Sequence, residues 1–350
     1  MAKVVYLLGA GASRGKRHSD YKQEDTKRED DIIEGLPVVS EIPDRLTYVI
    51  NLLSKINIDD SKYTRFRHEG AIDTHSWKEY VLGDLTWLRN ECQRHATIDT
   101  FAKKLYLTKR MEEYDKVKKM LALYFSIEQI INKTDFRYDT FLASILGKDL
   151  RIPDEICIVT WNYDSLIELA LKEYYKLRYP SDIGCYSIKD NIDEYRNACI
   201  FKVNGTASFD TWNSYAYFTD TSTGNLQQDQ LIEILKSYFN DKVLLSFAWE
   251  REESLPNDRF FKAIEERTKE ATTLVVIGYT FPFFNRKTDK LLLEKMPNLK
   301  QIYIQDPKAD MLVGNVEAVI PTNRVYCPQD EKIKIIPLKG VDQFHLPYEL

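Results

Sequence analysis

The stretch VVYLLGAGAS, residues 4–13, decides the fold that we expect for this chain. Its first five residues form a near-continuous apolar run, which is typical of a strand buried on both faces of a parallel sheet. The run leads directly into GAGAS, where Gly9 and Gly11 permit positive φ and a close approach of backbone N–H groups to a phosphate. The same glycines also suit a tight turn without a ligand, because the dinucleotide fingerprint GxGxxG needs a third glycine where this chain has Arg14.

Length and composition are those of an ordinary globular protein. The chain has 350 residues, enough for one large α/β domain or two smaller ones. Its net charge of −5 argues against a nucleic-acid surface over the whole molecule. There is no secretory h-region and no apolar run of about 18 residues, so we expect no membrane span. The cysteines form no CxxC pair, which argues against structural zinc and fits a reducing cytoplasm. They are Cys92, Cys157, Cys185, Cys199 and Cys327.

Four further apolar runs follow the first one and alternate with helical patterns. This alternation predicts an α/β fold, Rossmann-like and doubly wound, with a mostly parallel sheet. The runs lie at Ile156–Thr160, Cys199–Val203, Thr273–Ile277 and Gln301–Gln305. The helical patterns lie at residues 43–56, 99–133, 163–177 and 258–271.

The long interval between the first two strands is largely helical in pattern. We therefore expect one domain over residues 1–350, with a Rossmann-like core at 1–57 and 151–350 and a helical insertion at about 58–150. Residues 15–33, directly after the glycine loop, carry many charges of both signs. They fit either a solvated loop or a lid that closes over a ligand.

Every predicted strand ends in small or hydrogen-bonding residues. Ligands in open α/β sheets bind beyond the carboxyl ends of the strands, so these residues form the candidate site. The ends are Gly9–Ser13, Thr160–Asp164, Asn204–Thr206, Gly278–Phe281 and Asp306–Pro307.

Asn162 and Asp164 are the two most informative of these residues. In an extended segment, residues two apart point the same way, so both side chains would face the site. The amide of Asn162 can hold a ribose hydroxyl or a water. Asp164 can alternatively cap the helix that follows, and both roles are compatible.

Taken together, the strand ends resemble the sirtuin-like NAD-consuming family, and most closely its bacterial branch without a zinc module. The similarity covers nearly the whole chain in the order typical of the family. The similar segments are LLGAGAS (7–13), GLPVVSEIPDRL (35–46), TIDTFAKKLY (97–106), VTWNYDSLIELAL (159–171), FKVNGTASF (201–209), VVIGYTFPFFN (275–285) and IYIQDP (302–307).

The resemblance implies an NAD site at the strand ends. The pyrophosphate would be surrounded by Gly9, Ala10, Gly11 and Ser13. The adenosine end would lie near Gly278 and Tyr279, and the adenine ribose near Asp306. The nicotinamide ribose would lie by Asn162 and Asp164, and the expected contacts also include Thr160 and Gly205. The implied activity is hydrolysis of NAD to nicotinamide and ADP-ribose, in cytoplasmic defence against phage. Such proteins act as homo-oligomers or with an ATPase or phage-sensing partner. Deacetylation is disfavoured because the zinc thiolates are missing.

One position departs from the family pattern. Where the family has a histidine as general base, this chain has Asn204, which cannot accept a proton. General-base catalysis contributes typically about 10²–10⁴-fold, so two hypotheses stand. The chain is an NAD glycohydrolase with Asn162, Asp164 and Asn204 as its catalytic set, or it is an impaired NAD- or ADP-ribose-binding regulatory or scaffold subunit. A third, more distant hypothesis is a Rossmann-like nucleotide enzyme of another class, such as a nucleoside hydrolase or a phosphoribosyl-handling protein.

The five histidines offer little support for other chemistry. His75 and His95 could replace the missing base, although each also fits an ordinary surface or core position. No histidine has a metal-ligand partner at useful spacing, so we expect no metal cofactor. The remaining three are His18, His68 and His345.

Overall fold

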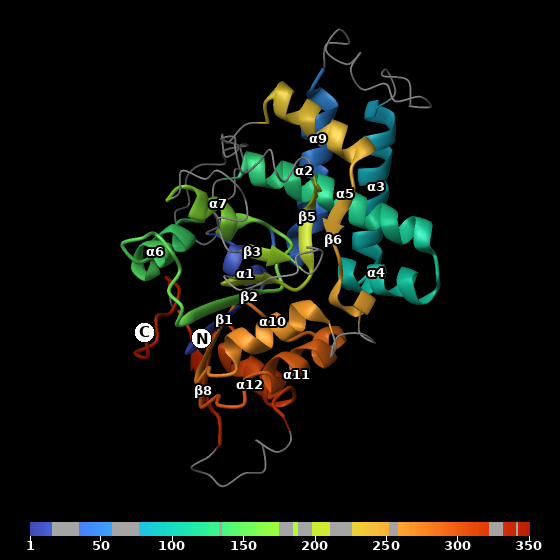
Figure 1. The fold of residues 1–350 in the computed structure, drawn as a ribbon. Helices are drawn as coiled ribbons and strands as arrows, with labels where there is room; N and C mark the ends of the chain where they lie inside the picture. Colours follow the sequence, from blue (N-terminus) through green and yellow to red (C-terminus); the bar gives the residue numbers. More distant parts are fainter. Residues whose placement is uncertain are drawn as a thin grey trace, which may run out of the picture. The chain divides into compact units, whose positions relative to one another are not determined.

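The structure is a computed structural model, in which two compact units can be described separately (Figure 1). One, the sheet unit, comprises residues 1–15, 134–206 and 246–350. The other, the helical unit, comprises residues 16–133 and 207–245. The described residues are 1–15, 35–57, 77–132, 135–174, 185–187, 198–210, 226–251, 258–321, 332–340 and 342–350.

The sheet unit is built on a seven-stranded parallel sheet in the order β3-β4-β2-β1-β7-β8-β9. Four of the five predicted strands are confirmed with their bounds, and the fifth is shortened to Ile200–Lys202. β3 and β9 were not predicted. The strands are β1 (Val4–Leu8), β2 (Ile156–Thr160), β3 (Cys185–Ser187), β4 (Ile200–Lys202), β7 (Thr273–Ile277), β8 (Gln301–Gln305) and β9 (Lys334–Leu338).

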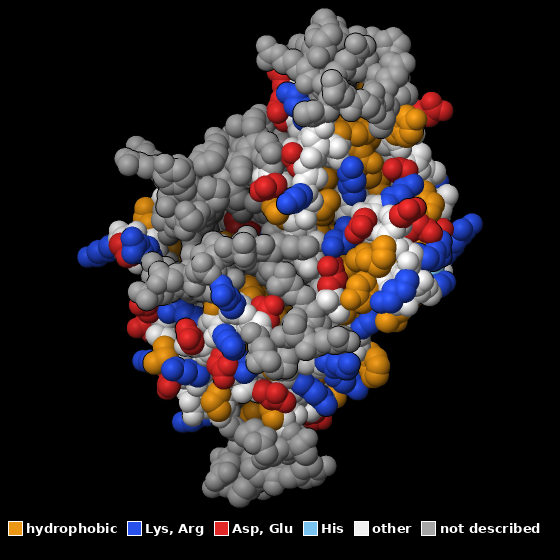
Figure 2. All heavy atoms as spheres, turned by 45° about the vertical axis from the view of Figure 1, so that its right-hand side comes forward, with side chains coloured by type: hydrophobic (Ala, Val, Ile, Leu, Met, Phe, Trp, Pro, Cys, Tyr) orange, Lys and Arg blue, Asp and Glu red, His pale blue; other side chains and the backbone are white. Residues whose placement is uncertain are grey.

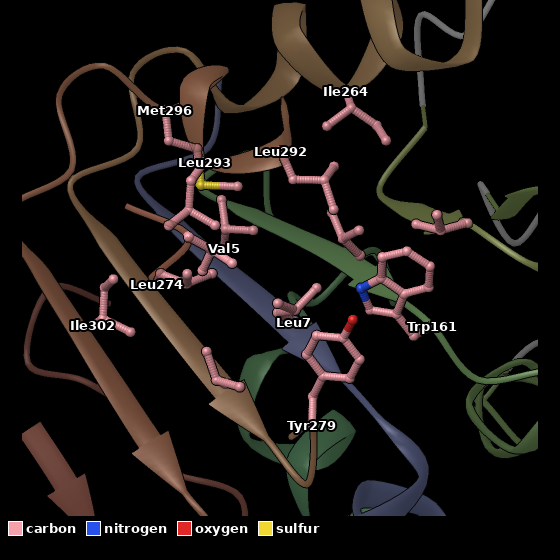
Figure 3. Close-up of a cluster of buried hydrophobic side chains, with 14 of the residues drawn as sticks. Val5, Leu7, Trp161, Ile264, Leu274, Tyr279, Leu292, Leu293, Met296 and Ile302 are labelled. Atoms are coloured by element: carbon pink, nitrogen blue, oxygen red, sulfur yellow. The ribbon is translucent and has the colours of Figure 1, made fainter. Parts of the chain in front are cut away.

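Helices cover both faces of this sheet. On one face, β1 side chains such as Val5 and Leu7 join a buried cluster with Ile264 and Leu292 (Figure 3). On the other face, the ring of Tyr6 packs edge-on against Phe141 at 4.8 Å. The α/β class and the parallel sheet are therefore confirmed, and the arrangement is compatible with a Rossmann-like fold. The helices are α10 (Arg259–Thr268), α11 (Arg286–Glu294) and α12 (Ala309–Glu317), and, towards Tyr6, α6 (Phe136–Ile145) and α7 (Leu166–Lys172).

The helical unit is organised around α5 (Met111–Ile131), most of which is buried. Its carboxylate Glu128 accepts two hydrogen bonds from the guanidinium of Arg45, each of 3.1 Å. The predicted helical stretch 99–133 is two helices, because the chain turns at Lys109 with a φ of 59°. The other elements are η2 (Val39–Glu41), α2 (Ile42–Lys55), α3 (Trp77–Arg94), α4 (Ile98–Leu107), α9 (Gln228–Asn240) and the pair β5 (Gly205–Phe209) and β6 (Val243–Leu245).

The observed units differ from the expected core and insertion bounds. Helix α6 belongs to the sheet unit, because it packs Phe141 on the sheet, whereas residues 207–245 join the helical unit, where α9 and β6 contact α5. Residues 16–57, expected in the core, also belong to the helical unit. Among the described residues, no helix is both long and apolar enough to cross a membrane.

Candidate functional site at the carboxyl edge of the sheet

The sheet brings its strand ends to one level. Leu8, the last residue of β1, is in register with Thr160 of β2 and Ile277 of β7. Thr160 in turn aligns with Lys202, and Ile277 with Gln305. Because the strands are parallel, the segments that follow them all leave at the same edge. The chain also crosses here from one side of β1 to the other, which is where α/β proteins bind their ligands.

The glycines after β1 serve a close backbone contact with the segment after β7. A Cβ at Gly9 would lie 2.6 Å from the carbonyl oxygen of Gly278, and one at Gly11 would lie 2.7 Å from its Cα. Gly9 has a φ of −122°, and Gly11 lies in the short helix α1 (Ala10–Ser13). Neither therefore uses the positive φ considered above; that conformation belongs to Gly278, at 60°.

The N–H groups of both glycines are also occupied within the protein. Gly9 donates to the carbonyl of Ile277, and Gly11 to that of Gly278, at 3.0 Å in each case. The tight-turn interpretation thus explains both residues. A pyrophosphate at this loop would have to be held by groups other than these two N–H donors.

A buried serine links β1 to the end of β2. The side-chain amide of Asn162 donates to Ser13 Oγ at 2.9 Å, and the Tyr138 hydroxyl lies 3.0 Å from the same Oγ. The backbone N–H of Asn162 donates to Thr160 Oγ1 at 3.0 Å. Within the described part of the chain, the amide oxygen Oδ1 of Asn162 has no hydrogen-bond partner. Asn162 is therefore held rigidly and keeps one acceptor for a ligand.

Asp164 does serve the start of the following helix, because its Oδ1 accepts from the N–H of Leu166, the first residue of α7, at 3.0 Å, although the N-cap position itself is Ser165. Burial raises the pKa of this carboxyl, while the nearby Lys202 ammonium and the hydrogen bonds from Leu166 and Ser13 act in the opposite direction. A raised pKa brings a carboxylate closer to the range in which it works as a base. The contact with the helix start and the candidate catalytic role are thus combined in one residue.

Lys202 and Glu168 form a buried ion pair next to Asp164 that the sequence analysis did not single out. Their side chains are 1% and 0% exposed, and Lys202 Nζ lies 2.6 Å from Glu168 Oε1. Nζ also donates to the backbone carbonyl of Asp164. Burial opposes the charge of Lys202, but the negative charges of Glu168, Cys185 and Asp164 and the hydrogen bond to Glu168 together outweigh it and raise the pKa of the amine. The signal in the sequence was a lysine inside the otherwise apolar strand CIFKV (199–203).

Asn204, at the position of the expected base, is engaged at both ends of its amide. Nδ2 donates to the carbonyl of Trp161 at 3.0 Å, and Oδ1 accepts from the N–H of Ala248 at 3.1 Å. Its own carbonyl accepts from Ser246 at 2.9 Å. The next residue, Gly205, takes a φ of 68°, so a glycine is required for the turn. The hydrogen bonds of the Asn204 side chain are therefore typical of a residue with a structural role.

At the end of β7, the side chain of Tyr279 turns back into the core (Figure 3). Its ring stacks on Trp161 with centroids 5.5 Å apart, and its hydroxyl lies 3.0 Å from both oxygens of Asp289. Asn285 donates to the same hydroxyl at 3.1 Å. Burial raises the pKa of Asp289 well above the usual range, with smaller opposing effects from Tyr279 and Trp161. An adenosine contact at Tyr279 would therefore use its backbone.

The remaining predicted contacts are less constrained. Asp306 is half-buried after β8, and its Oδ1 accepts from the N–H of Lys308 at 2.8 Å, at the start of α12. Ala10 opens α1. Arg137, which was not predicted, donates to the carbonyls of Ala12, at 3.1 Å, and Arg14 and so holds the far end of the glycine loop.

The histidines do not supply a base at this edge among the described residues. His95 lies in the helical unit, with Nδ1 3.0 Å from the carbonyl of Glu91. His345 lies near the carboxyl terminus, where its ring packs against Tyr303 at 4.5 Å. His18, His68, His75 and the predicted lid, apart from Gly15, fall outside the described residues.

The described residues also contain no group of three or more His, Cys, Asp or Glu that could hold a metal ion. On the face drawn in Figure 2, acidic and basic side chains of the described residues are interspersed, with no broad basic patch. Comparison with protein-family models and with curated proteins gives no significant match.

Proposed function

We propose that this chain binds NAD at the carboxyl edge of the sheet unit and hydrolyses it to nicotinamide and ADP-ribose. The observation that carries the proposal is the pairing of two side chains after β2. Asn162 is fixed by Ser13 and Thr160 and keeps an acceptor oxygen that none of the described residues occupies. Asp164, two residues on, is a buried carboxyl with a raised pKa. These are a positioning group and a base, side by side along the chain.

The chemistry needs only these two kinds of group. The bond between C1′ of the ribose and the pyridinium nitrogen breaks, and the nitrogen takes the electron pair and leaves as neutral nicotinamide. No proton donor to the leaving group is therefore required. Water adds to the oxocarbenium-like C1′ and loses its proton to Asp164, which passes it to solvent. Asn162 Oδ1 would accept a hydrogen bond from the ribose or the water, which fixes the attack geometry.

Three features of the chain agree with a dinucleotide ligand. The sheet is parallel, with helices on both faces and a change of direction between β1 and β7, as in Rossmann-like proteins. The strand ends are level, so one extended molecule could contact several of them. The resemblance to sirtuin-like NAD hydrolases of the zinc-less bacterial branch supports the reaction. We extend the proposal to that setting: a cytoplasmic anti-phage effector, acting as a homo-oligomer or with an ATPase or phage-sensing partner.

A second function, binding of NAD or ADP-ribose without catalysis, is favoured by one observation. Both ends of the Asn204 amide are bonded to backbone, so the position of the family's base contributes no proton acceptor. If Asp164 does not act as the base, the chain would be a regulatory or scaffold subunit that senses the nucleotide.

One pair of measurements separates the two functions. Purified protein, alone and with the products of neighbouring genes, is incubated with NAD, and nicotinamide release is followed by chromatography while NAD binding is measured by calorimetry. Release by the chain that falls at least about tenfold in Asn162→Ala supports hydrolysis, since positioning carries much of the rate. The matched control is Asn298→Ala, an exposed amide that donates to Lys269 elsewhere in the sheet unit. Binding without release supports the second function, and absence of both overturns the NAD site.

A further inference from the structure

Lys202 and Asn204 both donate hydrogen bonds to the segment that carries Asn162 and Asp164. We infer that the two form a two-point clamp that positions this segment, and that Asn204 is a positioning residue rather than a replaced catalytic base. The effect of the clamp on catalysis rests on the proposed function. The clamp itself does not, because it is defined by contacts within the sheet unit.

The two hydrogen bonds reach the backbone at the two ends of the segment that carries Asn162 and Asp164. Asn204 Nδ2 donates to the carbonyl of Trp161 at 3.0 Å, directly before Asn162. Lys202 Nζ donates to the carbonyl of Asp164 itself. The clamp residues are two apart in sequence, at the end of β4 and in the turn after it. In an extended segment such spacing places both side chains on the same face.

The clamp residues are themselves fixed. Lys202 is held by Glu168, 2.6 Å away and fully buried in the first turn of α7. Asn204 is held by the N–H of Ala248 at 3.1 Å, in the short helix η7 (Ala248–Arg251). Beyond the end of a strand, buried carbonyl groups have no partner in the sheet and need another donor. The clamp supplies one to each end of the segment and so fixes its backbone.

This reading accounts for asparagine at position 204. Its amide carries a donor and an acceptor on one carbon, and the structure uses both at once. An imidazole holds its two nitrogens in a ring and could not replace both bonds with the same geometry. A return to the family's histidine should therefore loosen the segment rather than restore a base.

Lys202 has an electrostatic effect as well. Around Asp164 lie the ammonium of Lys202 from β4, the carboxylate of Glu168 from α7 and the phenol of Tyr138 from α6, while Cys185 from β3 faces Lys202. The ammonium favours the ionised form of Asp164. Removal of the ion pair should move the acidic limb of the pH–rate profile to higher pH.

The first arm of the test needs no substrate. Hydrogen–deuterium exchange is measured on peptides covering residues 159–168 in the wild type, Asn204→Leu, Asn204→His and Lys202→Met. The double variant Lys202→Met with Glu168→Gln avoids leaving a buried charge unpaired. We expect these peptides to exchange at least about tenfold faster, while the peptide of α10 does not change. Lys295→Met, which breaks a partly exposed pair with Glu265, and Asn298→Ala are the controls.

The second arm uses nicotinamide release. The clamp variants should lose at least about tenfold in kcat with a smaller change in KM. Misplacement of the reacting groups reduces the stabilisation of the transition state more than it reduces the affinity for the substrate. The double variant should also show the shifted acidic limb. Unchanged exchange in both Asn204→Leu and the double variant, or higher activity in Asn204→His, would overturn the clamp. If the wild type releases no nicotinamide, the proposed reaction fails while the exchange arm still decides the clamp.

Discussion

The ends of β2 and β7 both lie next to β1, yet they bury their carboxyl groups in different surroundings. After β2, Asp164 lies near the ammonium of Lys202 and accepts a backbone hydrogen bond. After β7, Asp289 is fully buried and is held by the hydroxyl of Tyr279. Burial raises the pKa of both, but only for Asp164 does a cation oppose it.

The difference separates a carboxyl whose ionised form is stabilised by a cation from one whose ionised form is not. A nearby cation favours the ionised form of a carboxyl, whereas a carboxyl surrounded by neutral groups holds its proton more tightly and acts as a hydrogen-bonding core residue. The acceptor oxygen of Asn162 faces no partner among the described residues, while the amide of Asn285 is used on Tyr279. The end of β2 is therefore the candidate for chemistry, and the end of β7 is its structural counterpart.

The largest expected effect comes from the same substitution at the two carboxyl groups. Asp164→Asn removes the proposed base and should lower nicotinamide release by about 10²–10⁴-fold. Asp289→Asn keeps the shape of the side chain and a hydrogen-bonding partner for the Tyr279 hydroxyl, and should leave kcat within about threefold of the wild type. Release is measured at equal protein concentration after both variants are shown to be folded. Equal losses in the two variants would remove the distinction between the strand ends.

The second prediction concerns the contact that joins the end of β7 to the glycine loop. A Cβ at Gly278 would lie 2.4 Å from the backbone of Gly11 and Ala12, at a φ of 60°. Gly278→Ala should therefore lower the free energy of unfolding by about 3 kcal/mol, from overpacking and backbone strain together. Denaturant titration measures it. Gly314→Ala, in helix α12 with nothing within 4 Å, is the control and should gain about 0.5–1 kcal/mol.

A smaller effect is expected from the hydroxyl that orients Asn162. Thr160→Val keeps the shape but removes the acceptor of the Asn162 N–H. The lost hydrogen bond, worth about 0.5–1.5 kcal/mol, should lower nicotinamide release by about threefold to tenfold. Thr273→Val makes the same change at the start of β7, where Thr273 accepts from Gln301 at 3.2 Å. It should leave release unchanged, and a loss there as large as at Thr160 would contradict the assignment.

Much of this framework could be predicted from the sequence, because strands buried on both faces leave a direct signal. Continuous apolar runs located the five central strands, and polar residues after them located the carboxyl edge. The two short or peripheral strands carried no such signal: β3 has three residues, and β9 has the partly exposed sequence KIIPL. The bounds of the two units were not predicted either, because the sequence pattern of a helix at residues 136–145 is the same whether it packs on a sheet or on other helices.

The direction of individual side chains was less predictable. TWNYD and IGYTF look alike as strand ends, yet Asn162 stays at the edge while Tyr279 turns into the core towards Asp289, ten residues further on. No sequence pattern next to Tyr279 indicates that its side chain contacts Asp289. Likewise, the role of Asn204 depends on Trp161 and Ala248, each more than forty residues away along the chain. Contacts of this range follow from tertiary packing, and sequence patterns record only local periodicity.

The last prediction tests the same comparison through the pH dependence of stability. The pKa of Asp289 in the folded protein is raised well above 3.8, so its folded state binds a proton more tightly than its unfolded state. The stabilisation is complete below the unfolded pKa and is lost as the pH rises through the folded pKa. Asp289→Asn removes this dependence. Relative to the wild type, its free energy of unfolding should therefore rise as the pH increases from about 4 towards the pH at which wild-type Asp289 ionises. Denaturant titrations across this range measure the gap, and a gap that stays constant throughout would show that Asp289 titrates alike in both states.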